Sequence, residues 1–221
     1  MGSTDEELFA SARGELFSAV IGDVMDKMGL LHQFLAPAIQ PLERSMVVCG
    51  RALTVLEADI PEGGVSERPF GLMMDALDDL KADEVYICAG ASPQYALLGE
   101  MMSVRAMKCG AAGAVVDGYS RDTPGILSLG FPTFSHGGYA QDQAPRGQVV
   151  DFRIPIQAGQ VRVSPGDLVF GDVDGVCVVP RIAEEEALAR AFEKARREKV
   201  VRKALEDGVS ARDAFEKYGI L

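Results

Sequence analysis

Histidine is scarce in this sequence. His32 and His136 are the only two in the chain. A metal centre built mainly from imidazole ligands is therefore excluded, and any bound metal must be held mainly by oxygen atoms.

Cysteine pairs with metal-binding or redox spacing are also missing. The four cysteines are widely separated, contain no CxxC pair and each lie in or beside an apolar stretch, at Cys49, Cys88, Cys109 and Cys177. We expect buried free thiols, because disulfides and zinc sites require cysteines that come together in pairs or clusters.

Long apolar runs and a basic surplus are absent as well. No run approaches the ~20 residues needed to span a bilayer, and the N-terminus, MGSTDEELF, is acidic where a signal peptide is basic and then apolar. The formal net charge of −11 disfavours nucleic-acid binding, which requires a basic face. We expect a cytoplasmic protein that binds neither membrane nor nucleic acid. The acidic surplus also suits recruitment of cations, although ordinary solubility accounts for most of it.

What is present indicates one globular unit. The chain has 221 residues, of which 48% are hydrophobic and 25% charged, enough to bury a substantial core. Neither a repeat nor a linker divides it. We predict a single domain over residues 1–221, with N-terminal helices at about residues 5–28 and a C-terminal helical extension at about residues 183–221.

The apolar periodicity predicts an α/β fold. Helices are expected at residues 5–15, opened by a capping box from Thr4 to Glu7, and at 18–28, 70–80, 100–108, 183–206 and from 210. Strands are expected at residues 46–56, 83–89, 112–117, 131–135, 149–157, 161–163, 168–171 and 175–179, and loops at 35–42 and 59–69.

The segment 98–125 carries the candidate chemistry. Gly99 directly precedes the predicted helix at residues 100–108. The backbone N–H groups of the first helical turn, including those of Met101 and Met102, have no partners within the helix. Together with the helix dipole, these groups form a site for an anion.

Two charged residues follow the predicted strand at residues 112–117. In α/β folds, ligands bind beyond the C-terminal ends of parallel strands, where Arg121 and Asp122 are expected. A carboxylate ligand would meet the planar guanidinium of Arg121. A hard cation would meet Asp122, with Glu100 reached through water, since Mg²⁺ keeps several waters and needs one or two protein carboxylates.

Each of these features also has an ordinary structural interpretation. An adjacent arginine and aspartate often form a surface salt bridge, and Glu100 in a first helical turn complements the dipole. Met101, Met102 and Met107 are expected in the core rather than as ligands. Taken alone, the segment predicts only an α/β protein with an anion site.

The spacing of the motif resembles a known family. Glu100, twenty residues and then Arg121-Asp122 are similar to the acidic-x20-Arg-Asp signature of the RraA-like family. The resemblance extends over nearly the whole chain through FSAVIGDVMDKMG, GAAGAVVDGYSRD, FPTFSHG, VSPGDLVFGDVDGVCVVP and DAFEKYGIL. The family includes 4-hydroxy-4-methyl-2-oxoglutarate / 4-carboxy-4-hydroxy-2-oxoadipate aldolases and regulators of ribonuclease E.

This resemblance implies a swivelling β/β/α fold, a homotrimer or homohexamer, and a Mg²⁺ or Mn²⁺ cofactor. Asp122 would be the direct metal ligand, and Arg121 would bind the 2-oxo acid and stabilise the enolate oxygen. Glu100, in place of an aspartate found in some family members, would hold metal-bound water. The substrate-binding turn would consist of Gly99, Glu100, Met101 and Met102.

The resemblance also implies acidic residues contributed by a neighbouring subunit. Glu198 on the C-terminal helix is the candidate, although a solvated helix glutamate is the equally ordinary interpretation. A second neighbouring glutamate, expected near the end of the second helix, has no match among residues 29–35. The identity of the general base and the preferred substrate therefore stay open.

The expected function is a metal-dependent aldolase that cleaves a 4-hydroxy-2-oxo acid through a pyruvate enolate, with accompanying oxaloacetate decarboxylation. The alternatives are a non-catalytic regulator of the ribonuclease E type and an enolate-forming lyase that acts on another small 2-oxo acid. A Schiff-base aldolase is disfavoured, because Lys108, the lysine nearest the motif, lies at the opposite end of its helix from Gly99.

Overall fold

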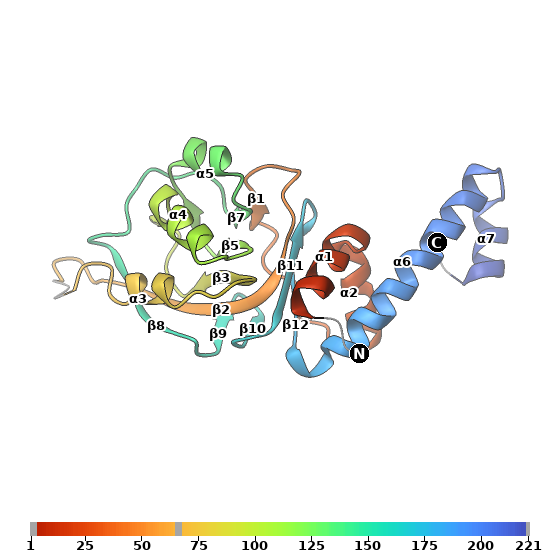
Figure 1. Ribbon diagram of the computed structural model, residues 1–221, viewed down its shortest axis with the longest axis horizontal. Coiled ribbons are helices and arrows are strands. Elements are labelled where there is room, and N and C mark those ends of the chain that lie inside the picture. The colour runs from red at the N-terminus through yellow and green to blue at the C-terminus, as the bar shows by residue number, and fades with distance from the viewer. Residues whose placement is uncertain (1–3, 65–67, 220–221) are drawn as a thin grey trace.

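A mixed sheet forms the centre of the molecule in the computed structural model, which describes residues 4–64 and 68–219 (Figure 1). The strand order is β1-β7-β5-β3-β2-β11-β12, and β8 also pairs with β2. The strands are β1 (Gln40–Pro41), β2 (Val48–Asp59), β3 (Glu84–Ala89), β5 (Gly113–Val116), β7 (Thr133–Ser135), β8 (Gly147–Phe152), β11 (Leu168–Asp172) and β12 (Gly175–Val179).

Four neighbouring strands, β7, β5, β3 and β2, run parallel, while the strands added to them are antiparallel. Parallel strands are covered on both faces and so read as continuous apolar runs. On β3, Val85 and Ile87 face one apolar cluster, whereas Tyr86 and Cys88 face another. Both sides of this strand are therefore core.

Three helices cover one face of the sheet: α3 (Met73–Asp78), α4 (Glu100–Lys108) and α5 (Thr123–Leu129) (Figure 1). Leu77, Ala106 and Ile126 contribute one apolar side chain from each helix to a cluster that includes Tyr86 and Val116. This packing fixes the starts of α4 and α5, from which the candidate site is built.

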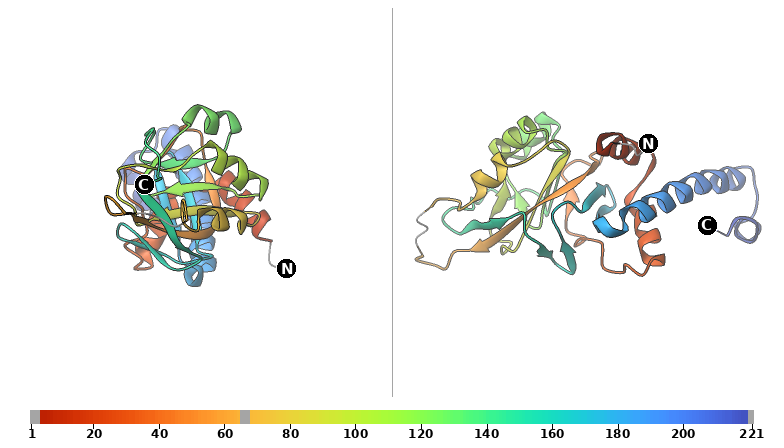
Figure 2. Two further views of the ribbon diagram at one scale, coloured as in Figure 1. Left: turned by 90° about the vertical axis from the view of Figure 1, so that its left-hand side faces the viewer. Right: turned by 60° about the horizontal axis from the view of Figure 1, so that its bottom comes forward.

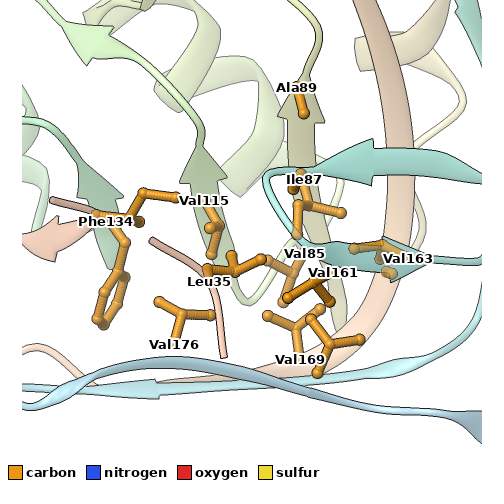
Figure 3. Close-up of a cluster of buried hydrophobic side chains, with 14 of the residues drawn as sticks. Leu35, Val85, Ile87, Ala89, Val115, Phe134, Val161, Val163, Val169 and Val176 are labelled. Atoms are coloured by element: carbon orange, nitrogen blue, oxygen red, sulfur yellow. The ribbon is translucent and has the colours of Figure 1, made fainter. Parts of the chain in front are cut away.

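On the other face, the hairpin of β9 (Ile156–Ala158) and β10 (Val161–Val163) folds over the sheet. Val161 and Val169 meet Val85 in an all-apolar interior (Figure 3). The sheet, bent by β11 and covered by the hairpin, nearly closes into a barrel.

The terminal helices pack on the outer side of β11 and β12. These are α1 (Asp5–Glu15), α2 (Ser18–Lys27) and the first half of α6 (Glu184–Glu206), which follows the short 3-10 helix η1 (Arg181–Ala183). Arg51 on β2 joins them through ion pairs with Asp5, 2.6 Å from Nη2 to Oδ1, and with Glu184. The rest of α6 and α7 (Ala211–Tyr218) extends away from the sheet (Figures 1 and 2).

The predicted α/β fold is confirmed, and most predicted elements occur within two residues of their expected ends. The capping box at Thr4 is present. Burial is confirmed for three thiols, whereas Cys109 is half-buried, and all four are free. Within the described ranges, no helix is long and apolar enough to cross a membrane. Part of the loop expected at residues 59–69 and the last two residues of the DAFEKYGIL segment lie outside the described residues.

Left-handed residues explain two errors in the predicted boundaries. The helix expected at residues 70–80 is shortened to α3, because Phe70 and Gly71 have φ values of 62° and 61° and Gly71 pairs with Val149. The strand expected at residues 149–157 is interrupted at Arg153, which has a φ of 54°.

Candidate functional site

Two short parallel strands bring the halves of the motif together. β4 (Ala96–Leu98) pairs with β6 (Tyr119–Ser120) in a small sheet of its own. Gly99 follows β4 and Arg121 follows β6, so both leave the sheet at the same edge. The sequence had placed Arg121 just past the strand at residues 112–117. The structure corrects this, because a turn and β6 intervene after β5 ends at Val116.

The two halves are in contact. The backbone N–H of Glu100 donates to Oδ2 of Asp122 at 3.3 Å. A Cβ atom at Gly99 would lie 2.8 Å from that same oxygen and 3.4 Å from Cγ of Arg121. The φ of −135° at position 99 suits any residue, so glycine is required here by the close approach rather than by the backbone conformation.

Arg121 is held between two carboxylates. Its Nη1 lies 3.1 Å from Oδ1 of Asp142, and its Nε lies 3.6 Å from Oδ2 of Asp122. Its backbone N–H donates to the carbonyl of Leu98 at 2.8 Å, which fixes the residue to β4. The side chain is 37% exposed, so the guanidinium retains a solvent-accessible part that can meet an anion.

Asp122 has an unusual backbone for a residue with a side chain. Its φ of 57° lies in the left-handed region, where it precedes α5. Such conformations concentrate at functional sites, where the surrounding structure enforces them. Its Oδ2 meets Glu100 and Arg121, whereas no hydrogen bond or ion pair from the described residues engages Oδ1. That oxygen is available to a ligand.

The donor set limits the kind of metal that can bind. Across residues 4–64 and 68–219, no group of three or more histidine, cysteine or acidic side chains is arranged to hold a metal ion. A tetrahedral zinc centre does not fit. A hard cation that keeps most of its waters does fit, because it requires only Asp122 and one further carboxylate through water.

Glu100 and the three methionines of α4 differ in where they point or in how exposed they are. The carboxyl carbon of Glu100 lies where a Cβ at Gly125 would approach it to 2.4 Å, so its side chain points towards the start of α5. Met102 is half-buried, but Met101 is 69% exposed and Met107 is 40% exposed. The expectation that these methionines are core residues is therefore wrong for Met101 and Met107, whose side chains are exposed.

A cavity of about 190 Å³ connects Gly99, Arg121 and Asp122 but is not lined by Glu100, and it is smaller than the pockets of drug-sized ligands. Its lining combines both halves of the motif with residues from α3 and from the loop before β8, namely Phe70, Met73, Ala96, Leu97, Leu98, Gly99, Met101, Met102, Arg121, Asp122, Asp142 and Gln143. The sequence reasoning missed Phe70, Met73, Asp142 and Gln143, which carry no motif of their own.

A buried acid lies beneath the cleft. Oε2 of Glu57 on β2 accepts a hydrogen bond from Nε2 of Gln143 at 2.5 Å, and Glu57 is 2% exposed. Burial raises the pKa of this carboxyl to about 8. The sequence offered one sign of it, an acid directly after the mostly apolar run LTVL.

Glu198 does not join the site within one chain. It lies on α6, at the opposite end of the molecule from α4 and α5 (Figures 1 and 2). It forms an ion pair with Lys194 at 2.8 Å and lines a larger hollow of about 550 Å³ with Phe17 and Leu205. That hollow contains none of the motif residues, so we place the chemistry in the smaller cleft.

Comparisons with known proteins agree with the sequence motif. The model of the RraA-like family, described as Aldolase/RraA, matches residues 18–178. A Halalkalibacterium halodurans protein provisionally named 4-hydroxy-4-methyl-2-oxoglutarate aldolase is 32% identical over 195 residues, covering 88% of this chain and 87% of the relative.

Two solved structures are also similar. One, from Streptomyces coelicolor, is RraAS2, described as an unusual member of the RNase ES inhibitor RraA protein family. It is 26% identical, with a TM-score of 0.78 over 91% of this chain and 98% of the other. An uncharacterized protein from Pseudomonas syringae pv. tomato, 22% identical, shares the fold, with a TM-score of 0.85 over 98% and 96% of the two chains. The family match, which covers most of the chain, shows that the protein belongs to the RraA-like family.

Proposed function

We propose that the protein is a divalent-metal-dependent aldolase that cleaves a 4-hydroxy-2-oxo acid and releases pyruvate by way of its enolate. The observation that carries this proposal is the convergence of Arg121, Asp122 and the start of α4 on one small cavity. An enolate-forming enzyme needs a Lewis acid, a cation and hydrogen-bond donors for a carboxylate. Arg121 supplies the cation, the start of α4 supplies the donors, and Asp122 would hold a metal that acts as the Lewis acid.

The start of α4 is suited to the substrate carboxylate. The Gly99 N-cap supplies no side-chain hydrogen bond, and the backbone N–H of Glu100 is directed at Asp122. The N–H groups of Met101 and Met102 are left for a ligand at the positive end of the helix dipole. Arg121 adds a full charge on the other side of the cavity.

The reaction follows from these positions. The C3–C4 bond breaks, its electron pair passes to C3 and the 2-oxo oxygen, and the C4 hydroxyl loses its proton as it becomes a carbonyl. Arg121 stabilises the charge that develops on the enolate oxygen. In this proposal Glu100, whose side chain lies beside the start of α5, receives the hydroxyl proton through water. Protonation at C3 completes pyruvate.

Mg²⁺ or Mn²⁺ held by Asp122 would supply Lewis-acid polarisation of the 2-oxo group. Oxaloacetate should reach the same enolate by losing CO₂ instead of an aldehyde or ketone. We therefore include oxaloacetate decarboxylation in the proposed activity.

Assembly into a homotrimer or homohexamer belongs to the same proposal. Val200 and Phe215, on the part of α6 and on α7 that extend from the sheet, are 54% and 57% exposed. Apolar side chains on a projecting element suit a contact with another copy of the chain, and closed cyclic assemblies are common. Such a contact would carry Glu198 to a neighbouring cleft.

The test supplies Mg²⁺ and, separately, 4-hydroxy-4-methyl-2-oxoglutarate, 4-carboxy-4-hydroxy-2-oxoadipate and oxaloacetate, and follows pyruvate with lactate dehydrogenase. Arg121→Ala should lower kcat/KM by ~10²–10³, the scale for a lost charge-stabilising group. Arg121→Lys should restore only part, because an ammonium lacks the planar fork. Arg105→Ala, which removes an exposed arginine of α4 paired with Asp78, is the matched control. An Arg121→Ala variant as active as the wild type would place the site elsewhere.

The competing function is regulation of a ribonuclease, supported by the likeness to RraAS2. An aldolase forms pyruvate from its substrate, whereas a non-catalytic regulator does not. Failure to form pyruvate from any of the three acids, together with stoichiometric binding of a ribonuclease E in a pull-down with purified proteins, would favour the regulator. A lyase acting on another small 2-oxo acid would show metal-dependent turnover only with a different substrate. A Schiff-base route would be revealed by borohydride trapping of pyruvate on Lys108.

A further inference from the structure

Glu57 is a buried acid for which the fold provides no counter-ion. It is 2% exposed, and no lysine or arginine in the described part of the chain pairs with it. Among residues 4–64 and 68–219, Gln143 alone donates a hydrogen bond to it, at Oε2, while Oε1 is buried without a partner there. Burying a carboxyl group with a single hydrogen bond is unfavourable, so packing alone gives no reason for an acid here.

The backbone around Glu57 links β2 to the wall of the cleft. The pairing of β2 with β8 is shifted by a bulge between Leu56 and Glu57. The loop before β8 is held by its own backbone, because the carbonyl of Gln143 accepts from the N–H groups of Arg146 at 2.5 Å and Gly147 at 2.9 Å. Bulges redirect side chains and recur beside active sites. Glu57 is thereby placed against the side chain of Gln143.

Gln143 belongs to the cleft that contains Arg121. It lines the same cavity, and the preceding residue, Asp142, pairs with Arg121 at 3.1 Å. Its amide nitrogen is occupied by Glu57, but no donor from the described residues reaches its Oε1. The two ends of an amide group point in different directions, so anchoring the nitrogen fixes where the oxygen points.

We propose that Glu57 is a positioning residue that holds the amide of Gln143 so that its Oε1 accepts a hydrogen bond from the 4-hydroxyl group of the substrate. This inference rests on the proposed aldolase function and assigns it a specificity-determining residue, Gln143. An amide oxygen can orient a hydroxyl group but cannot take its proton, so the proton still passes to another group.

The neutral form of Glu57 suits this role. Burial raises its pKa to about 8, so the acid holds its proton at neutral pH. It can then accept from Gln143 without placing a negative charge beneath a site where negative charge develops. An ionised carboxylate there would oppose the charge that develops on the enolate.

Oxaloacetate provides an internal control, because it forms the same enolate but has no 4-hydroxyl group. The experiment compares kcat and KM for 4-hydroxy-4-methyl-2-oxoglutarate and for oxaloacetate in the wild type, Gln143→Met, Glu57→Met and Glu57→Gln, each saturated with Mg²⁺. For both methionine variants, aldol cleavage should lose about tenfold in kcat/KM, the scale for a lost hydrogen bond and an unpaired amide. Decarboxylation should fall clearly less than aldol cleavage in the same variant. Glu57→Gln keeps an acceptor oxygen and should stay near the wild type.

The double variant Glu57→Met/Gln143→Met sharpens the test, since two residues that act as one unit lose little more together than singly. Equal losses of both activities in variants that still unfold cooperatively would overturn the inference but would not contradict the proposed aldolase function. Unchanged aldol cleavage in Gln143→Met would overturn it as well, whatever the result for the Glu57 variants. A wild type that decarboxylates oxaloacetate but cleaves no hydroxy acid would also refute it. A wild type inactive on both would instead contradict the proposed function on which the inference rests.

Discussion

At the end of the molecule where β4 and β6 stop, Arg121 contacts two carboxylates. That of Asp142, which is distant in sequence, lies 3.1 Å away, and that of Asp122, the next residue, lies 3.6 Å away. At the other end, on the projecting part of α6, Lys203 pairs with Asp207, the C-cap residue four positions further along the chain. The first arrangement requires the tertiary fold, whereas the second would form in any helix with this sequence.

This difference separates chemistry from assembly. Exposed ion pairs within one helix contribute little stability, so the charges of the projecting segment, here called the arm (residues 198–218), explain solubility rather than shape. The exposure of the apolar residues Val200 and Phe215 is not explained by any contact within the arm. At the cleft, it is the clustering of charged side chains that requires a functional explanation. Substitutions at the cleft should therefore alter turnover, and substitutions in the arm should alter assembly first.

The largest expected effect is the loss of Asp122. Asp122→Ala should lower turnover by more than about 10³, because it removes the proposed metal ligand. EDTA should abolish the activity of the wild type, and Mg²⁺ or Mn²⁺ should restore it. The assay is pyruvate release, with circular dichroism to show that the variant is folded. The arm control, Asp207→Ala, should retain wild-type turnover. Full activity in metal-free buffer would refute the metal assignment.

A smaller loss is expected from adding one carbon at position 99. The backbone there accepts alanine, but its Cβ would lie 2.8 Å from Oδ2 of Asp122, so the site must shift. A misplacement of catalytic groups by about 1 Å can cost about 10² in rate. Gly14→Ala, in α1 and with nothing within 4 Å of the added atom, is the control. Steady-state kinetics would disprove the contact argument if Gly99→Ala matched the wild type while remaining folded.

The arm should show the opposite pattern. Phe215→Asp combined with Val200→Asp should shift the trimer or hexamer towards monomer in light scattering, because exposed apolar contacts between copies become charged. Glu198→Gln should leave assembly intact and lower kcat by about 10², the low end for a group that assists proton transfer. A wild type that is monomeric and fully active would exclude any role for the arm at a neighbouring site.

The sequence offered a signal for part of the cleft and none for its surroundings. Glu100, Arg121 and Asp122 could be proposed as a group because they flank regular elements at a recognisable spacing. In the structure the backbone N–H of Glu100 contacts Asp122, and the roles of the three residues stay predictions. β6 and α5 were missed because two or seven residues are too few for a periodic pattern.

Asp142 and Gln143 could not be found for a different reason. They lie in an irregular loop, and their proximity to Arg121 depends on how β8 pairs with the far end of β2. Local sequence does not encode such a contact. The same holds for Glu57, whose burial follows from the bulge and from the cover provided by that loop.

The smallest expected effect on turnover, and the clearest on stability, comes from Glu57→Gln. Burial raises the pKa of Glu57 from its ordinary 4.5 to about 8, so the folded protein binds this proton more tightly than the unfolded chain does. Below about pH 4.5 both states hold the proton, and the stability associated with the neutral acid is fully present. As the pH rises towards 8, only the unfolded chain releases it, and unfolding becomes easier by at most about 1.4 kcal/mol per pH unit.

Glutamine does not titrate, so this pH-dependent loss should disappear in Glu57→Gln. Urea unfolding of the wild type and the variant at equal protein concentration, between about pH 5.5 and 8.5, measures the difference in their unfolding free energies. As the pH rises, the unfolding free energy of Glu57→Gln should increase relative to that of the wild type, and the difference should level off above the raised pKa of Glu57. Glu206→Gln, which removes an exposed arm carboxylate paired with Arg202, should change stability little at any pH. Parallel pH profiles for the wild type and Glu57→Gln would mean that the carboxyl is ionised in the folded protein. The cleft would then hold an uncompensated charge, and the contrast with exposed arm carboxylates such as Glu206 would need another cause.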